Sequence, residues 1–216
     1  AGLAHPNSGD EIIAGLQSAP LWFEPGSQFR YGGTGYRLLA AIIEQVTGLR
    51  SEEYFEQHFF EPLGLELTFA CEGRYEEIAQ GYLLASGRLE PVLAYNPSRI
   101  VGSSGLCSTS GDLIAWQQAL ASGEVISAEL YETMTRPTLL ADGTTVPYGY
   151  ALGLGEGIVA HGGSLPGFRS WMIVYPEDDL TLVILSNTDI PAGYSLDALA
   201  EVIAGRILEG AGEKGD

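Results

Sequence analysis

Four strand-like runs follow one another closely in the last third of the sequence, at residues 148–154, 157–161, 169–175 and 180–186. The connections between these runs are short and rich in glycine or aspartate, which favours antiparallel pairing of neighbours. An amphipathic helix is predicted to follow at 196–208. We therefore expect one antiparallel sheet with a terminal helix packed on it, which limits the fold to layered architectures.

The first two-thirds of the sequence is typical of helices. Apolar residues recur at helical spacing over 34–46, and Gly48 follows as a stop. Ser51 is expected to cap the next helix, which Pro62 and Gly64 end. Further elements are predicted as helices at 10–19, 112–120 and 127–134, loops and small strands over 81–109, and a turn at Asp142–Gly143. The sequence thus predicts one α+β domain, with a mainly helical part at 1–135 and antiparallel strands and the last helix at 136–216.

The charge of the chain argues against two classes of partner. There are 28 acidic and 10 basic residues, which gives a formal net charge of −18. A field of that sign repels nucleic acid and anionic membranes. No apolar run approaches the roughly 20 residues of a membrane-spanning helix. Residues 1–10 are polar and lack the basic region of a signal peptide, so the compartment stays open between periplasm, cell exterior and cytoplasm.

Cysteine and histidine give little support for a metal site. Cys71 and Cys107 are too far apart for a zinc pattern, and the sequence favours two inert core thiols over a single bridge. The histidines His5, His58 and His161 are also far apart, and they form no His-x-x-x-His pair. We therefore expect neither a catalytic metal nor another cofactor.

Two short segments combine glycines with a group that can carry chemistry. Phe29-Arg-Tyr-Gly-Gly-Thr-Gly-Tyr36 places Tyr31 just before the helix predicted at 34–46, and its glycines allow close approach of the backbone. Taken alone, Tyr31 is also explained by packing on Trp22 or Phe29. His161-Gly-Gly-Ser164 lies at the end of one strand, where missing side chains mark a bulge or a closely approaching ligand.

Together with their neighbours, these segments resemble the β-lactamase-like serine hydrolases. This family includes AmpC-type β-lactamases, D-alanyl-D-alanine carboxypeptidases and β-lactamase-fold esterases. Further family landmarks stand in the expected order at Glu61-Pro-Leu-Gly64, Gly105-Leu-Cys-Ser-Thr-Ser-Gly-Asp-Leu113 and Val183-Ile-Leu-Ser-Asn187. The resemblance covers nearly the whole chain. It implies a β-lactamase/transpeptidase-like α+β fold, with an antiparallel sheet flanked by helices and a helical subdomain.

The resemblance also implies roles for single residues. Tyr31 matches the tyrosine that shuttles the proton of the nucleophilic serine. His161 matches the lysine or histidine of the family's Lys/His-x-Gly strand. Gly162 and Gly163 leave room for the substrate backbone, and the Ser164 amide matches a donor of the oxyanion hole. Gly33 departs from the family pattern, which has asparagine there to contact the substrate amide. This departure favours the hydrolysis of esters over β-lactamase or peptidase activity.

The nucleophile of this family lies in a Ser-x-x-Lys motif that the 216 residues do not contain. The only lysine is Lys214, and the residue three positions before it is Ala211. We therefore expect that an N-terminal part with the nucleophile is missing, and that the chain alone is inactive. Without that part, Ile173, Val183 and Leu185 are expected to be exposed on an open face of the sheet.

Two functions are compatible with these patterns. The first is a portion of a serine hydrolase that acts on a small-molecule ester, amide or β-lactam through an acyl-enzyme. The alternative is a non-catalytic binding or regulatory protein that kept the fold and lost the serine. The partners expected for the first function are the substrate, a cleaved N-terminal segment of the same protein, or further copies of the chain.

Overall fold

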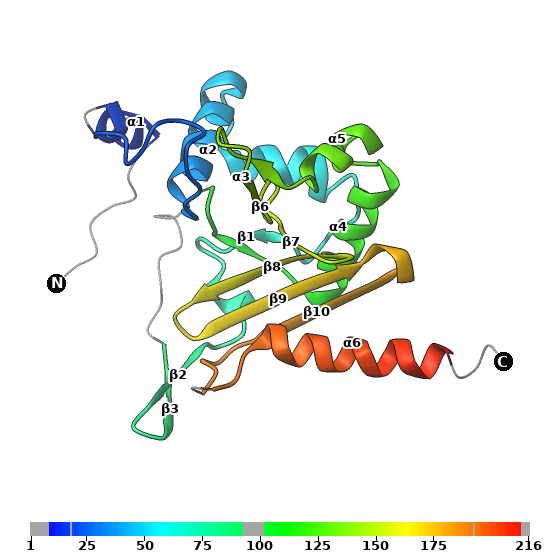
Figure 1. Ribbon diagram of the computed structural model, residues 1–216. Helices are drawn as coiled ribbons and strands as arrows, with labels where there is room; N and C mark the ends of the chain where they lie inside the picture. Colours follow the sequence, from blue (N-terminus) through cyan, green and yellow to red (C-terminus); the bar gives the residue numbers. More distant parts are fainter. Residues whose placement is uncertain (1–8, 18, 93–101, 192, 213–216) are drawn as a thin grey trace. The chain divides into compact units, whose positions relative to one another are not determined.

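The computed structural model describes residues 9–17, 19–92, 102–191 and 193–212 (Figure 1). His5 and Lys214 lie outside the described residues. The chain forms two compact units that are discontinuous in sequence. The first comprises Ala1–Ile78, Ala94–Ser108 and Leu139–Thr144, and the second comprises Ala79–Leu93, Thr109–Thr138 and Thr145–Asp216. The helices within 109–138 belong to the second unit and pack with its sheet, and the division of one domain into parts at 1–135 and 136–216 stays a prediction.

The first unit contains the helices of the N-terminal half. They are α1 (Gly9–Gln17), α2 (Thr34–Thr47), α3 (Ser51–Phe55) and the π-helical turn η1 (Glu56–Phe60), with a short 3-10 turn η2 (Tyr75–Glu77) later in the chain. Gly48 ends α2 as predicted, because its φ of 75° is unfavourable for other residues. The prediction for the α3 cap was wrong by one residue. Arg50 is the N-cap, its backbone N–H donates to Glu53 Oε2 at 3.2 Å, and Ser51 is the buried first residue of the helix.

A disulfide joins two distant segments of the first unit. Strands β1 (Phe69–Ala70) and β4 (Leu106–Cys107) pair antiparallel, with Phe69 opposite Cys107. This pairing brings the Cα atoms of Cys71 and Cys107 to 5.3 Å, and their sulfurs are bonded. The expectation of two inert thiols was therefore wrong. The two cysteines are 36 positions apart in sequence, and only the strand pairing shows that they meet.

The second unit is built on a four-stranded antiparallel sheet in the order β10-β9-β8-β7. Its strands are β7 (Gly153–Gly155), β8 (Ile158–Leu165), β9 (Phe168–Tyr175) and β10 (Leu180–Ser186), with the 3-10 turn η4 (Pro176–Asp178) before the last strand. Three of the four predicted runs are confirmed. The run 148–154 was mostly wrong, because Gly149 lies against the Met134 carbonyl and Ala151 has a φ of 61°, so the backbone bends there.

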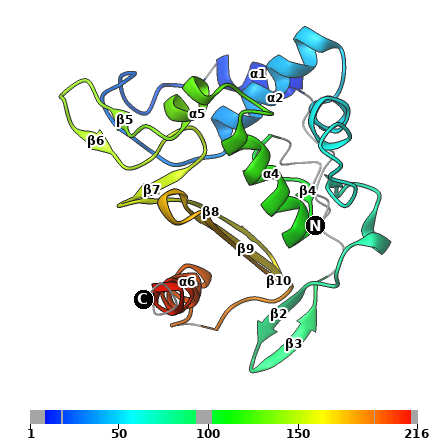
Figure 2. The same cartoon turned by 90° about the vertical axis from the view of Figure 1, so that its right-hand side faces the viewer.

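Helices cover both faces of this sheet. α6 (Leu196–Gly212) packs on β9 and β10 from one side, and α4 (Ser110–Ser122) packs on β10 from the other (Figure 2). α5 (Ala128–Met134) follows α4 and begins after the N-cap Ser127, which accepts a bond from the Leu130 N–H at 3.3 Å. The predicted α+β architecture is confirmed. Among the residues described, no helix is long and apolar enough to cross a membrane.

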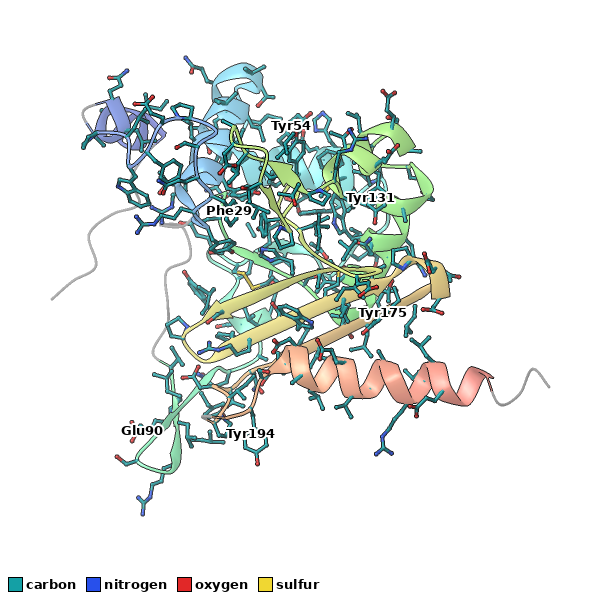
Figure 3. All side chains as sticks on the ribbon, in the orientation of Figure 1. Phe29, Tyr54, Glu90, Tyr131, Tyr175 and Tyr194 are labelled. Atoms are coloured by element: carbon teal, nitrogen blue, oxygen red, sulfur yellow. A yellow bond between two sulfur atoms is a disulfide. The ribbon has the colours of Figure 1, made fainter. Side chains whose placement is uncertain are left out.

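Two apolar clusters fill the spaces on either side of the sheet. Cross-strand neighbours Val159 and Val174 belong to one cluster, whereas the next pair, Ala160 and Ile173, belongs to the other, as the alternation of side chains requires. Ala200 of α6 completes the second cluster, and Tyr175, labelled in Figure 3, packs against it. Ile173 is only 1% exposed, so its predicted exposure was wrong, because α6 covers that face.

For Leu185 and Val183, the predicted exposure has a different outcome from that of Ile173. Leu185 of β10 is 43% exposed, as expected, and Val183 is half-buried. The remaining strands are short hairpins, β2 (Tyr82–Ala85) with β3 (Arg88–Pro91) and β5 (Thr138–Leu139) with β6 (Thr145–Val146). The predicted turn at Asp142–Gly143 lies between β5 and β6. Gly143 has a φ of 87°, and Asp142 Oδ1 accepts a bond from the Thr144 N–H at 2.9 Å.

Candidate active site

Tyr31 lies in an irregular segment that leads directly into α2. Gly33 is the N-cap of that helix, with φ −80° and ψ −11°. The Tyr31 side chain is 64% exposed, which is unlike a tyrosine buried in a core. Phe29, two residues earlier, is labelled in Figure 3 and is 41% exposed. That Tyr31 acts in proton transfer stays a prediction.

The loop before Tyr31 is held by hydrogen bonds within the first unit. Its turn is closed by the Ser27 N–H, which donates to the Glu24 carbonyl at 3.0 Å, and Gly26 adopts a φ of 78°. The Ala141 N–H donates to the Gly26 carbonyl at 2.8 Å and ties the loop to the Leu139–Thr144 segment. These bonds give the approach to Tyr31 a defined backbone path.

His161 lies on β8, on the sheet face opposite α6. Its Nε2 lies 3.2 Å from the hydroxyl of Tyr148, and the two rings meet edge-on with centroids 6.3 Å apart. Burial lowers the pKa of His161 below its ordinary value, and a hydrogen bond with the Gly162 backbone acts in the opposite direction. The ring is therefore held toward its neutral form, in which one nitrogen accepts and the other donates.

Side chains of β9 occupy the space that side chains at positions 162 and 163 would need. The β8–β9 register is continuous from Val159 to Leu165, so there is no bulge. A Cβ on Gly162 would lie 2.6 Å from a ring carbon of Trp171, and one on Gly163 would lie 2.4 Å from Ser170 Oγ. The space beside Gly163 is therefore occupied by the Ser170 hydroxyl. That the two glycines receive a substrate stays a prediction.

In the part of the chain that the structure describes, β7 pairs with only the first part of β8, and the glycines of β8 lie beyond that part. β7 pairs with β8 only at Ile158, Val159 and Ala160. Within the residues described, no strand continues this pairing along 161–165. An edge of this kind presents backbone N–H and C=O groups to an added extended chain. The Ser164 amide belongs to this segment, and its role as an oxyanion donor stays a prediction.

The turn between β8 and β9 is held by contacts within the second unit. Arg169 pairs with Asp189 at 2.7 Å and donates to the Phe168 carbonyl at 2.8 Å. Gly167 has a φ of 77°, and a Cβ there would meet Val92 at 2.4 Å. The β8–β9 turn is thus closely packed, which holds the end of β8 that follows the glycines.

Sequence patterns missed two residues of this region, Tyr148 and Ser170. Tyr148 contacts His161 although it lies outside the strand ladder, and Ser170 faces Gly163 across the β8–β9 pair. The glycine beside Tyr148, Gly149, was the only signal in the sequence. The predicted proximity of Tyr31 and His161 stays a prediction, because the two residues belong to different compact units.

Among the described residues, no group of three or more His, Cys, Asp or Glu side chains is arranged to hold a metal.

The lowered pKa of His161 predicts a pH dependence of stability. Between the folded pKa and the ordinary value of 6.5, the unfolded state binds more protons, so the free energy of unfolding rises with pH. We expect acidification from about pH 7 to about pH 5 to destabilise the wild type more than His161→Gln. Urea unfolding across this range measures the effect. His58→Gln, at an exposed position, serves as the control, and equal pH slopes for wild type and His161→Gln would contradict the prediction.

Comparison with known proteins gives matches over nearly the whole chain. The Beta-lactamase family model matches residues 1–205. The D-aminopeptidase of Brucella anthropi is 28% identical over 178 residues, which cover 76% of this chain and 32% of the relative. The D-aminopeptidase of Gluconobacter oxydans is 29% identical over 183 residues, which cover 82% of this chain and 34% of the relative. The chain thus spans about a third of the length of the curated relatives it matches.

Solved structures show the same fold. The octameric penicillin-binding protein homologue from Pyrococcus abyssi matches with a TM-score of 0.77 and 28% identity, covering 96% of this chain and 49% of the homologue. The D-amino acid amidase from Ochrobactrum anthropi SV3, complexed with L-phenylalanine amide, matches with a TM-score of 0.77 and 22% identity, covering 99% of this chain and 66% of the amidase. The fold expected from the sequence motifs is therefore confirmed.

Proposed function

The chain belongs to the beta-lactamase family, and from this premise we propose that it forms the tyrosine- and histidine-bearing part of a serine hydrolase that cleaves amides. The observation that carries this proposal is the edge of β8 at Gly162, Gly163 and Ser164, where β7 no longer pairs with it among the described residues. An extended substrate laid along that edge gains backbone hydrogen bonds without displacing a strand. The exposed Tyr31 hydroxyl at the start of α2 supplies a proton-transfer group.

The substrate class follows from the relatives. Curated relatives are D-aminopeptidases, and a solved structure with the same fold is a D-amino acid amidase. Amides of D-amino acids are therefore the substrates we propose, among the esters, amides and β-lactams that the sequence motifs allow. Gly33, where the family motif has asparagine, stays the feature of this chain that favours esters. Parallel assays of D-phenylalanine amide and p-nitrophenyl acetate would separate the two.

The proposed mechanism assigns each residue one task. The serine oxygen attacks the carbonyl carbon, and its proton passes to the Tyr31 oxygen, which then delivers a proton to the leaving nitrogen. The Ser164 N–H stabilises the oxyanion that forms on the carbonyl oxygen. Water then hydrolyses the acyl-enzyme. A tyrosine with an ordinary pKa of about 10 needs a nearby cation for this work at neutral pH, and the lysine of Ser-x-x-Lys supplies it.

The nucleophile comes, in this proposal, from a polypeptide segment that is not among these 216 residues. Apolar residues on α2 and β10 support the presence of an additional covering segment or chain. Leu39, Ile42 and Val46 of α2 are 54%, 45% and 79% exposed, and Leu185 of β10 is 43% exposed. A fully exposed side chain of this kind gains roughly 1.5–3 kcal/mol on burial, and each of these residues gains the part that corresponds to its exposed fraction. Denaturing mass spectrometry and light scattering distinguish a bound segment from a homo-oligomer like that of the octameric homologue.

We expect the 216-residue chain by itself to be inactive. It contains no Ser-x-x-Lys, so D-phenylalanine amide, p-nitrophenyl acetate and nitrocefin should be hydrolysed at the background rate. A fluorophosphonate probe should label no residue in stoichiometric amount. Adding a segment that carries Ser-x-x-Lys should restore both labelling and hydrolysis. Stoichiometric labelling of the isolated chain would show that another residue is the nucleophile.

A second candidate is a non-catalytic binding or regulatory protein. It is favoured by the absence of Ser-x-x-Lys from these residues and by Gly33 in the asparagine position. A protein of this kind binds D-phenylalanine but stays inactive on D-phenylalanine amide even when the nucleophile-bearing segment is supplied. Calorimetric titration together with the reconstitution assay therefore decides between the two functions.

A further inference from the structure

The Tyr31-Gly32-Gly33 segment lies against a polar residue that the motif pattern does not include. We propose that Ser103 replaces the missing side chain at position 33 and hydrogen-bonds the amide of the substrate beside Tyr31. This inference rests on the proposed amide-hydrolase function and names a specificity-determining residue for it. It starts from the observation that Gly33 has no room for a side chain of its own.

The contact between the two positions is direct. A Cβ placed on Gly33 would lie 2.7 Å from Ser103 Cβ and 3.0 Å from Ser103 Oγ. Separations this short are not found between ordinary Cβ atoms, so the Ser103 side chain occupies the volume that a residue at 33 would fill. Both residues belong to the first compact unit, and Ser103 is exposed. Ser103 is therefore an exposed polar residue directly beside the motif.

The backbone around Ser103 is fixed against α2. Gly102 has a φ of +83°, and a Cβ there would lie 2.3 Å from the Tyr36 carbonyl oxygen and 2.8 Å from Ala40 Cβ. Only glycine tolerates both that φ and that contact. On the other side of the turn, the Cys71 N–H donates to the Gly105 carbonyl at 2.9 Å. Contacts on both sides thus hold Ser103 at a defined position beside the first turn of α2.

The chemistry of serine suits the proposed role. A hydroxyl carries one donor and two acceptor lone pairs, so it can bond either the N–H or the C=O of a substrate amide. Asparagine at position 33, the family pattern, would offer a donor and an acceptor in the same region. A chain with Gly33 and Ser103 therefore keeps a polar contact for an amide substrate, with a shorter side chain.

The first test measures hydrolysis of D-phenylalanine amide by the enzyme completed with its Ser-x-x-Lys segment. Ser103→Ala should lower kcat/KM about tenfold, as expected for one lost hydrogen bond, without changing the melting temperature. Ser103→Thr keeps the hydroxyl and should retain activity within about threefold of wild type. Ser104→Ala, in the same exposed turn, is the matched control and should behave as wild type.

The second test uses the steric contact itself. Gly33→Asn should lower the melting temperature, because the new side chain collides with Ser103, and the added change Ser103→Gly should restore it. The double variant should also recover most of the activity that Ser103→Ala loses. Unchanged kcat/KM in Ser103→Ala, with an active wild type, would overturn the assignment of Ser103 alone. A completed wild type that neither hydrolyses D-phenylalanine amide nor binds D-phenylalanine would overturn the proposed function as well.

Discussion

Replacing Tyr31 by phenylalanine is expected to lower kcat/KM for D-phenylalanine amide by about 100- to 10,000-fold in the completed enzyme, the range typical of a lost general acid–base group. Phenylalanine keeps the ring and removes only the oxygen to which the proposed mechanism transfers the serine proton. Because the Tyr31 side chain is 64% exposed, the free energy of unfolding should change by less than about 0.5 kcal/mol. Steady-state kinetics and urea unfolding of the same preparations measure the two effects separately.

A matched control distinguishes proton transfer from a general effect of tyrosine removal. Tyr75 is an exposed tyrosine of the same compact unit, at the short turn η2. Tyr75→Phe should leave both kcat/KM and stability unchanged. If Tyr31→Phe retained more than about a tenth of the wild-type kcat/KM, the hydroxyl would not be the proton-transfer group. A large loss of stability in Tyr31→Phe would instead indicate a structural role.

Reduction of the Cys71–Cys107 disulfide is expected to lower the free energy of unfolding by about 4 kcal/mol. The cross-link closes a loop of 36 residues, and its removal returns the corresponding chain entropy to the unfolded state. A loss of this size is a large part of the free energy of unfolding of a typical whole domain, which is about 5–15 kcal/mol. Urea unfolding with and without dithiothreitol measures it.

The control for reduction is the double variant Cys71→Ala/Cys107→Ala. It should be destabilised by a similar amount and should not respond to dithiothreitol. Titration of two free thiols in the purified, unreduced native protein would contradict the disulfide directly. A difference below about 1 kcal/mol between oxidised and reduced wild type would show that the loop is already ordered by other contacts in the unfolded state.

The sequence by itself determined the elements that depend on local periodicity. The spacing of apolar residues and the stop at Gly48 predicted α2 nearly to the residue. The alternating or β-branched runs predicted β9 and β10, and the short connections predicted their antiparallel order. The motif at Tyr31 and the motif at His161 were also readable, because glycines beside a reactive group leave a pattern in the sequence itself. From the order of these landmarks the family followed.

Only the tertiary structure decided which distant residues meet. The sequence favours separate thiols at Cys71 and Cys107, whereas the β1–β4 pairing brings the two residues together in a disulfide. Ile173 was expected on an open face, yet Ala200 of α6 packs against it. Ser103 lies 70 positions from Gly33 and fills its side-chain volume. The physical reason is the same in each case. Backbone propensity acts between residues a few positions apart, whereas these contacts arise from the packing of whole elements against one another.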